Sequence, residues 1–560
     1  MTAASLVEVA RFETTRRLLS HLVNEGLCAA FPEPDETDGA RWLRLTSTRN
    51  DSAANSAVRV RILPGKLALG DGGRVTSVIR PHLLRPPVLL LEDDQPPRAE
   101  LDPGVVFQFV YPWFGEPGVE SMRDPIAEEL QNAAANQEIW LEVAAQQQPL
   151  DLYSPAIEWE KTLITGHPTH PSPLPQIEPR RVIDMLSPEV LFLSVPRSQI
   201  RTSGPFEELL SDLLTKLDIP ATTDDRIIIP ALAQQAPSIV FRFNDVLVLG
   251  STRVSAQASM RTLTVPRELQ FKYHLKLSLA CQITSALRTI TPWTALGGAE
   301  VSEMLEKLLP PGMWVFKEVA AVTGAQENFN DAKHLSCILR EDLELRANKQ
   351  DESLIIASAL SQLPVTEAGP WKAQAESLLP TEGKKEWLKS YTSRLLNLTL
   401  TPLANHGVGL EAHGQNMCVR ICRKTREVKG FAIRDFGGIR LHMPTLRSQG
   451  YDLHTIPPGA ATMTDDLHDV WSKVHHSLFQ NHLGSLIVAL GLEEDGGWEI
   501  VRNEVKAILQ PADGSGSASA RDLYEFLTAE TMPFKCFLRM RMEGKYRDYV
   551  ERKLPNVVLY

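Results

Sequence analysis

The sequence has no hydrophobic run long enough to cross a membrane. No stretch reaches the roughly 18 consecutive apolar residues that a membrane-spanning helix requires. The first residues include Glu8, Arg11 and Arg16, so they lack the apolar centre of a signal peptide. We therefore expect a soluble protein of the cytoplasm with no membrane partner.

Cysteines are also few. The chain has six of them in 560 residues, and their irregular spacing argues against a disulfide framework. Cys418 and Cys422 lie four residues apart, but no second cysteine pair lies nearby, which favours packing or a free thiol over a metal site. No other set of histidines and cysteines has metal-ligand spacing. A metal-binding oxidoreductase is therefore disfavoured.

Basic residues do not outnumber acidic ones. The chain has 58 Lys and Arg against 69 Asp and Glu, a formal net charge of −11. Proteins that bind nucleic acid need a broad cationic surface, so we expect no nucleic-acid partner. Any anionic ligand must meet a few arginines and lysines gathered inside a cleft.

The length of the chain exceeds what one hydrophobic core usually holds. We expect three domains, at 1–150, 151–378 and 379–560. Predicted strands and helices follow one another without regular βαβ alternation, which indicates the α+β class. The apolar spacing predicts helices at 3–27, 124–149 and 274–291, strands at 58–63 and 105–111, and a β-hairpin over 416–442.

Two His-Pro pairs stand three residues apart in the segment Gly166-His167-Pro168-Thr169-His170-Pro171. Proline holds the preceding residue in an extended conformation, so the loop presents two imidazoles rigidly. The segment is either a ligand site or a proline-stiffened loop whose histidines cap neighbouring backbone groups. Zinc is less favoured, because no third ligand follows at a familiar spacing.

Two further segments pair hydroxyl groups with a guanidinium. In Ser259-Met260-Arg261-Thr262, two hydroxyls flank an arginine, a set that can bind phosphate oxygens or form an ordinary surface turn. Thr284 and Arg288 lie four residues apart and share one face of the helix predicted at 274–291. Because that face is otherwise apolar, Arg288 needs an anionic partner from the protein or from a ligand.

Polar residues gather at one end of the predicted hairpin. A turn near 425–426 brings Asn416 close to Asp435. The gathered residues are Glu411, His413, Asn416, Arg434 and Asp435. Their carboxylate and amide oxygens can hold Mg²⁺, which proteins usually bind through few side chains and nucleotide phosphates. The alternative is the salt-bridged end of an ordinary hairpin.

Together with Lys535 to Arg541, these segments resemble, in the same order, the motifs of the aerobactin-synthetase-like family. Its members are siderophore synthetases that work independently of nonribosomal peptide synthetases. The resemblance implies a cupped-hand fold, with a thumb in 1–150, fingers in 151–378 and a palm in 379–560, around a central cleft for ATP and a carboxylate. It implies a ligase that adenylates a polycarboxylic acid such as citrate, releases pyrophosphate, and joins the acid to an amine or hydroxyl in the synthesis of a siderophore or another natural product. A homodimer would fit the family.

The resemblance also implies roles for individual residues. The expected ATP contacts are His167, Ser259, Arg261, Thr262, Lys276, Asn416 and Asp435. The expected carboxylate contacts are His170, Thr284, Arg288 and His413. Arg288 and His413 are also the expected catalytic residues, because they can stabilise the charged transition state of adenylation. Mg²⁺ is expected at Glu411 and Asp435.

One departure from the family pattern supports a different function. The two His-Pro pairs are usually followed by a Lys-x-Arg pair, but here the corresponding stretch is Leu174-Pro175-Gln176. This loss favours a catalytically silent relative that binds a carboxylate or a ferric chelate. The retained Ser259–Thr262 segment, His413 and Asp435 favour the ligase.

Overall fold

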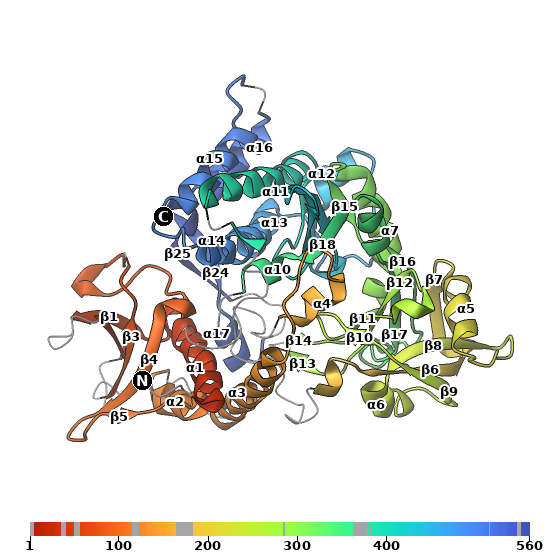
Figure 1. Cartoon of the computed structure of the whole chain (residues 1–560), viewed down its shortest axis with the longest axis horizontal. Helices are drawn as coiled ribbons and strands as arrows, with labels where there is room; N and C mark the ends of the chain where they lie inside the picture. The colour runs from red at the N-terminus through yellow and green to blue at the C-terminus, as the bar shows by residue number, and fades with distance from the viewer. Residues whose placement is uncertain are drawn as a thin grey trace.

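The computed structural model describes residues 5–34, 41–49, 56–65, 67–114, 122–163, 183–283, 286–362, 378–380, 382–514, 516–545 and 550–560. Three parts surround a common centre (Figure 1): an N-terminal part in red and orange, a middle part in yellow and green, and a C-terminal part mainly in teal and blue, with α7 (Pro292–Leu308) and β15 (Met313–Val315) in green. Helices and mostly antiparallel strands are mixed along the chain, which confirms the α+β class. Within the described ranges, no helix combines the length and hydropathy needed to span a bilayer.

The N-terminal part is a five-stranded antiparallel sheet packed against three helices. The strands pair in sequence order: β1 (Ala29–Pro34), β2 (Arg41–Thr46), β3 (Ser56–Ile62), β4 (Leu84–Glu92) and β5 (Arg98–Ala99). The helices are α1 (Leu6–Asn24), α2 (Pro103–Val110) and α3 (Arg123–Ala145). A capping box between Ser5 and Glu8 starts α1. The predicted strand at 58–63 and the helices at 3–27 and 124–149 are confirmed.

The middle part contains two sheets. The six-stranded sheet has the order β10-β11-β12-β17-β16-β7, and the three-stranded sheet has the order β8-β6-β9. Its strands are β6 (Glu189–Pro196), β7 (Ile200–Ser203), β8 (Arg226–Leu232), β9 (Leu247–Arg253), β10 (Ser255–Ala256), β11 (Thr262–Thr264), β12 (Tyr273–Leu277), β16 (Glu318–Gly324) and β17 (Ser336–Glu341). The helices here are α5 (Phe206–Lys216), α6 (Ala236–Val240) and α8 (Phe329–Ala332), and a short ribbon pairs β13 (Gln282–Ile283) with β14 (Ala286–Leu287).

The C-terminal part is built on a four-stranded sheet with the order β15-β21-β20-β18. Its central strands, β20 (Met417–Cys422) and β21 (Val428–Ile433), confirm the hairpin predicted over 416–442. The outer strands are β15 (Met313–Val315) and β18 (Glu352–Ile356), and small sheets join β19 (Val408–Gly409), β22 (Arg440–His442) and β23 (Met463–Thr464), and β24 (Thr531–Lys535) with β25 (Glu551–Pro555). The helices are α7 (Pro292–Leu308), α9 (Glu344–Lys349), α10 (Ala357–Leu360), α11 (Lys384–His406), α12 (Met443–Ser448), α13 (Leu467–Val474), the π-helix η13 (His475–Leu483), α14 (Gly484–Leu490), α15 (Gly497–Leu509) and α16 (Ala518–Leu527).

The strand predicted at 105–111 is wrong, because these residues belong to α2. The Asp102 side chain accepts hydrogen bonds from the N–H groups of Gly104 and Val105 at 3.0 and 3.1 Å. Pro103 occupies the first turn, where its missing N–H costs nothing. A short, mostly apolar run fits a buried strand or a buried helix equally well, and here the N-terminal cap decides.

The helix predicted at 274–291 is also wrong. The chain instead forms β12, which pairs with β11 and β17. The residues from His274 to Leu279 alternate between polar and apolar, the two-residue period of a strand. Leu275 and Leu277 enter the core of the middle part, and Lys276 points to the opposite face of the sheet. Arg288 therefore lies on no helix, and Thr284 is outside the described residues.

Two short helices connect the parts. In α17 (Phe537–Met542), near the C-terminus, Leu538 and Met542 enter the core of the N-terminal part. In α4 (Ala156–Lys161), Trp159 enters the core of the C-terminal part, and the Glu160 carboxylate accepts the backbone N–H of Ala258 from the middle part at 2.9 Å. These crossings hold the three parts around one central cavity.

Candidate active site

A cavity of about 330 Å³ lies where the three parts meet. Its wall comes from α1, from the turn between β10 and β11, from the segment before β20, and from η13 and β24. The predicted residues Ser259, Arg288 and His413 all line it. The structure thus brings residues from the middle and C-terminal parts to one space. His167, His170 and Thr284 lie outside the described residues.

The Ser259–Thr262 segment forms a tight turn at the cavity wall. Met260 has a φ of +63°, which is uncommon for a residue with a side chain. The Ser259 hydroxyl accepts the N–H of Thr262 at 3.2 Å, and the Arg261 guanidinium donates to the carbonyls of Arg288 and Thr289 at 2.9 and 3.1 Å. Arg261 therefore fixes the backbone that carries Arg288. Phosphate binding by this turn stays a prediction.

Arg288 follows the short strand β14 and is held from two sides. Its N–H donates to the carbonyl of Cys281 at 3.0 Å, and its carbonyl accepts both the Leu279 N–H at 3.1 Å and the Arg261 side chain. Its guanidinium lines the cavity. The backbone around Arg288 is therefore fixed before any ligand arrives, which favours precise binding of a carboxylate.

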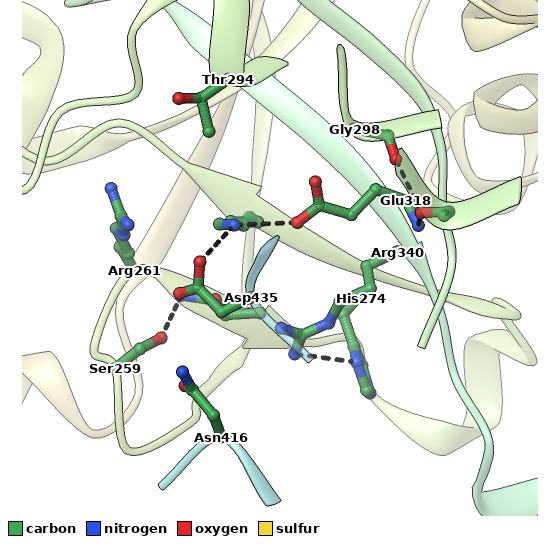
Figure 2. A network of polar contacts seen from close by, with 12 residues as sticks. Ser259, Arg261, His274, Thr294, Gly298, Glu318, Arg340, Asn416 and Asp435 are labelled. Atoms are coloured by element: carbon green, nitrogen blue, oxygen red, sulfur yellow. Dashed lines mark hydrogen bonds and ion pairs between the residues drawn. The ribbon is translucent and has the colours of Figure 1, made fainter. Parts of the chain in front are cut away.

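Lys276 bridges two carboxylates beside this turn (Figure 2). Its Nζ lies 2.8 Å from Oε1 of Glu318 and 3.0 Å from Oδ1 of Asp435. The side chains of Lys276 and Glu318 are buried, whereas that of Asp435 is 26% exposed. Lys276 thus holds Asp435 from the protein side, and a direct contact between Lys276 and a nucleotide phosphate stays a prediction.

Asp435 lies two residues after the end of β21 in a strained backbone conformation, with a φ of +65° and a ψ of 85°. Burial alone would raise its pKa, but Lys276 and Arg261 hold the pKa well below its usual range. The carboxylate is therefore ionised at neutral pH. Across the hairpin, the carbonyl of Asn416 accepts the N–H of Arg434 at 3.1 Å. Asn416, just before β20, and Asp435, just beyond β21, therefore lie at the same end of the hairpin.

Arg434 points away from these groups and joins the hairpin to α4. Its guanidinium forms an ion pair with Glu160 and donates to Oε1 of Gln257 at 3.1 Å and to the carbonyl of Gln415 at 2.8 Å. Arg340 donates to the same Gln257 oxygen at 2.5 Å. These contacts within the protein account for the buried Arg434 without a ligand.

His413 and Glu411 are the other two ionisable residues at the hairpin end. Burial alone would raise the pKa of Glu411, but an ion pair with Lys473 and the nearby His413 hold it at about 2. Burial lowers the pKa of His413 more than Glu411 raises it, so the imidazole is neutral at pH 7 in the ligand-free protein. A neutral imidazole can donate one N–H to an anion, and the anion would then raise its pKa.

Several cavity residues were missed by sequence reasoning. From η13 come His476, Gln480 and Asn481, and from β24 comes Lys535. Burial and the nearby Lys473 lower the pKa of Lys535 to about 7. A signal was present: residues 475–482 hold five His, Gln and Asn side chains within a helical stretch, a density that structural helices rarely need. A π-helix is also uncommon and often lies at a functional site.

The histidines of η13 predict a loss of stability in acid. Burial lowers the pKa of His475 and His482 to about 4 and that of His476 to about 3, whereas an unfolded histidine titrates near 6.5. As the pH falls below about 6.5, the unfolded chain binds protons that the folded chain does not, so each histidine removes up to about 1.4 kcal/mol per pH unit. We expect the melting temperature to fall steeply between pH 6.5 and 4.5.

The variant His482→Gln tests this cause. It should reduce the number of protons taken up on unfolding at pH 5 by up to one, because one buried neutral imidazole is gone. His406, a half-buried histidine at the end of α11 that bonds Gln449, supplies the control for the substitution: His406→Gln leaves the three buried histidines of η13 in place. Equal melting temperatures at pH 6.5 and 4.5 would contradict the prediction.

Comparison with known proteins adds independent findings. The model of the IucA / IucC family matches residues 241–362, and that of the ferric iron reductase FhuF-like transporters matches residues 385–550. The chain is 43% identical over its full length to an NRPS-independent siderophore synthetase-like protein of Aspergillus thermomutatus, 97% of which is covered. It is 33% identical, over 73% of its length and 67% of the other chain, to an NRPS-independent siderophore synthetase of Rhizopus delemar.

A solved structure agrees with this assignment. The ATP-bound aerobactin synthetase IucA of Klebsiella pneumoniae has the same fold, with a TM-score of 0.75, 13% sequence identity, and coverage of 99% of this chain and 100% of the other. The fold, the motif order and the two fungal relatives lead to one conclusion. The chain belongs to the family of siderophore synthetases that act independently of nonribosomal peptide synthetases.

Proposed function

We propose that the protein adenylates a polycarboxylic acid such as citrate with ATP and joins it to an amine or hydroxyl. One observation carries the proposal: Arg288 and His413, from separate parts of the fold, line one cavity with Ser259. The structurally similar synthetase IucA was solved in an ATP-bound state, which supports ATP as a substrate. The fungal relatives support a product that is a siderophore or a related natural product.

In the first step, a carboxylate oxygen of the acid attacks the α-phosphorus of ATP. A P–O bond forms, and the bond to pyrophosphate breaks. Two anions must approach each other, so the protein has to supply positive charge and N–H donors where negative charge develops. In this proposal Arg288 binds the carboxylate through its planar guanidinium and His413 donates an N–H, while Ser259, Arg261 and Thr262 serve the phosphates.

In the second step, the amine nitrogen or hydroxyl oxygen attacks the carbonyl carbon of the acyl adenylate. The new C–N or C–O bond forms, the bond to AMP breaks, and one proton leaves the nucleophile. Adenylation is needed because a free carboxylate is a poor acyl donor. Positioning of the two reactants carries much of the rate, and no covalent bond to the protein is required.

Mg²⁺ fits this site only together with a nucleotide. Within the described residues, no group of three or more His, Cys, Asp or Glu side chains is placed to hold a metal ion. Asp435 and Glu411 each face a lysine, yet both are ionised, and Mg²⁺ commonly uses one or two carboxylates plus phosphate oxygens. These two residues and Asn416 would hold the ion, which would neutralise charge on the triphosphate.

The test is pyrophosphate release by the purified protein with ATP and Mg²⁺ across a panel of di- and tricarboxylic acids. Hydroxylamine serves as a generic nucleophile. We expect release with one acid or a few, accompanied by the corresponding hydroxamate. Binding of ATP without release for any acid in the panel would count against citrate-like substrates. The absence of both pyrophosphate release and ATP binding would favour the catalytically silent relative. The missing Lys-x-Arg pair would then be the physical reason.

A further inference from the structure

Glu160 joins the middle and C-terminal parts at the wall of the cavity. It lies on α4 and is 6% exposed. Its Oε2 accepts the backbone N–H of Ala258 at 2.9 Å and an N–H from Nη2 of Arg434 at 3.0 Å, while its Oε1 pairs with Nη1 of Arg434. A single buried carboxylate therefore ties a turn of the middle part to the hairpin of the C-terminal part.

The ion pair of Glu160 with Arg434 reaches the backbone at three places. Arg434 also donates to the carbonyl of Gln415, from Nε at 3.0 Å and from Nη2 at 2.8 Å. The pair thus holds three segments of the chain, at Ala258, at Gln415 and at Arg434 itself. In each segment the next residue along the chain is an expected ATP contact: Ser259, Asn416 and Asp435.

Gln257 provides a second link between the same elements. Its Oε1 accepts N–H groups from Arg434 at 3.1 Å and from Arg340 at 2.5 Å. Its carbonyl accepts the N–H of Met260 at 2.7 Å and so closes the turn that begins the Ser259–Thr262 segment. Two side chains therefore connect this turn to the hairpin.

The Glu160–Arg434 pair supplies geometry more than stability. Burial alone would lower the pKa of Arg434, but Glu160 raises it above its usual value, so the guanidinium is charged. Replacing a buried ion pair by apolar residues often leaves stability unchanged or higher, so stability alone gives little reason to bury this one. A bidentate pair has fixed directions, which apolar side chains cannot provide.

We propose that Glu160 is a positioning residue for ATP: together with Arg434 it fixes the backbone beside Ser259, Asn416 and Asp435 before the nucleotide binds. This inference rests on the proposed function and deepens it, because it names the group that aligns the ATP contacts of two parts. Glu160 touches no reacting atom in this role. Without it, ATP has to order the three segments itself, and that ordering reduces its affinity.

The test compares Glu160→Gln with the wild type in two measurements. The first is the Kd for ATP with Mg²⁺ and no acid, and the second is the pair of KM values, for ATP and for the acid, in pyrophosphate release. Glutamine still accepts the Ala258 N–H but lacks the charge that orients Arg434. We expect the Kd and the KM for ATP to rise by about 10- to 100-fold.

The KM for the acid should stay near the wild-type value, because the backbone of Arg288 has its own bonds to Leu279 and Cys281. Glu160→Asp keeps the charge on a shorter side chain and should give an intermediate Kd for ATP. A residue that served stability alone would not separate the two KM values in this way.

Glu352→Gln is the matched control. Glu352 on β18 and Arg420 on β20 form a bidentate pair of the same kind, at 2.8 and 3.2 Å, with both side chains 8% exposed. Neither residue is among those described as lining the cavity. Glu352→Gln should lower the melting temperature about as much as Glu160→Gln does, yet keep the wild-type Kd and KM for ATP.

The double variant Glu160→Met with Arg434→Met separates stability from positioning. It leaves no uncompensated charge, so it should regain part of the melting temperature lost in Glu160→Gln while ATP binding stays weak. Recovery of the wild-type Kd in this double variant would overturn the inference. Wild-type Kd and KM values for ATP in Glu160→Gln would overturn it as well.

Hydrogen exchange on the wild type needs no variant to fold. The backbone N–H groups of Ala258 and Arg434 donate to Glu160 and to the carbonyl of Asn416, so we expect both to be protected before ATP is added. Rapid exchange of both in the free protein, slowed only by ATP, would overturn the inference, since the nucleotide would then order these segments. Wild-type protein that neither binds ATP nor releases pyrophosphate would instead defeat the proposed function itself.

Discussion

Replacing Arg288 or His413 by alanine is expected to lower acid-dependent pyrophosphate release by about 100- to 10,000-fold. Both residues line the cavity and are the proposed carboxylate contacts. In Arg288→Ala the two negatively charged reactants lose the guanidinium that would hold one of them. The measurement is kcat/KM for the acid, with melting temperatures to show that each variant folds.

Two substitutions at position 413 separate the possible roles of the imidazole. Burial keeps the pKa of His413 below its usual value, so the free protein holds a neutral ring that can donate one N–H. His413→Gln, which also offers N–H donors, should therefore retain more activity than His413→Ala. Equal losses in both would indicate that a charged imidazolium is required. Arg253→Ala, an exposed arginine on β9 outside the cavity wall, is the control and should match the wild type.

The sequence predicts the hairpin end and the polar turn well, because both are local. Asn416 and Asp435 come together through a single hairpin, whose register follows from alternation along its two arms. The secondary structure of residues 274–288 is not predicted correctly. The apolar spacing predicts a helix over 274–291, whereas the described residues there form a strand, a loop and a short ribbon. The alternation through Lys276 was the better signal.

The distant contacts of the site could not be predicted. Lys276 contacts Glu318, which lies on a strand some 40 positions later. Residues of α1 and η13 line one cavity, and α17 packs into the N-terminal core because the C-terminal segment returns to it. Such contacts depend on tertiary packing, and no local pattern in the sequence encodes them. The polar face of α1 carries a signal of its own, since Glu13, Arg17 and His21 recur at a spacing of four. That spacing is equally typical of a solvent-exposed face, so only the structure shows that this face lines the cavity.

Lys276→Met is expected to destabilise the protein by about 3–5 kcal/mol and to abolish detectable adenylation. The substitution leaves Glu318, which is 1% exposed, without its cation, and removes the group that holds Asp435. Methionine fills a similar volume, so the loss of stability comes from electrostatics and not from a cavity left in the core. Denaturant unfolding measures the first effect, and pyrophosphate release measures the second.

Lys317→Met provides the matched control, because Lys317 pairs with Glu306 and Glu341 at 3.4 and 3.6 Å near the surface. Exposed pairs contribute little, so this loss should stay below about 1 kcal/mol. The double variant Lys276→Met with Glu318→Met should recover part of the stability but none of the activity, because it removes the uncompensated charge while Asp435 stays unsupported. If Lys276→Met costs no more than Lys317→Met, the buried bridge does not hold the site together. Activity that survives in Lys276→Met would show that the backbone after β21 alone fixes Asp435.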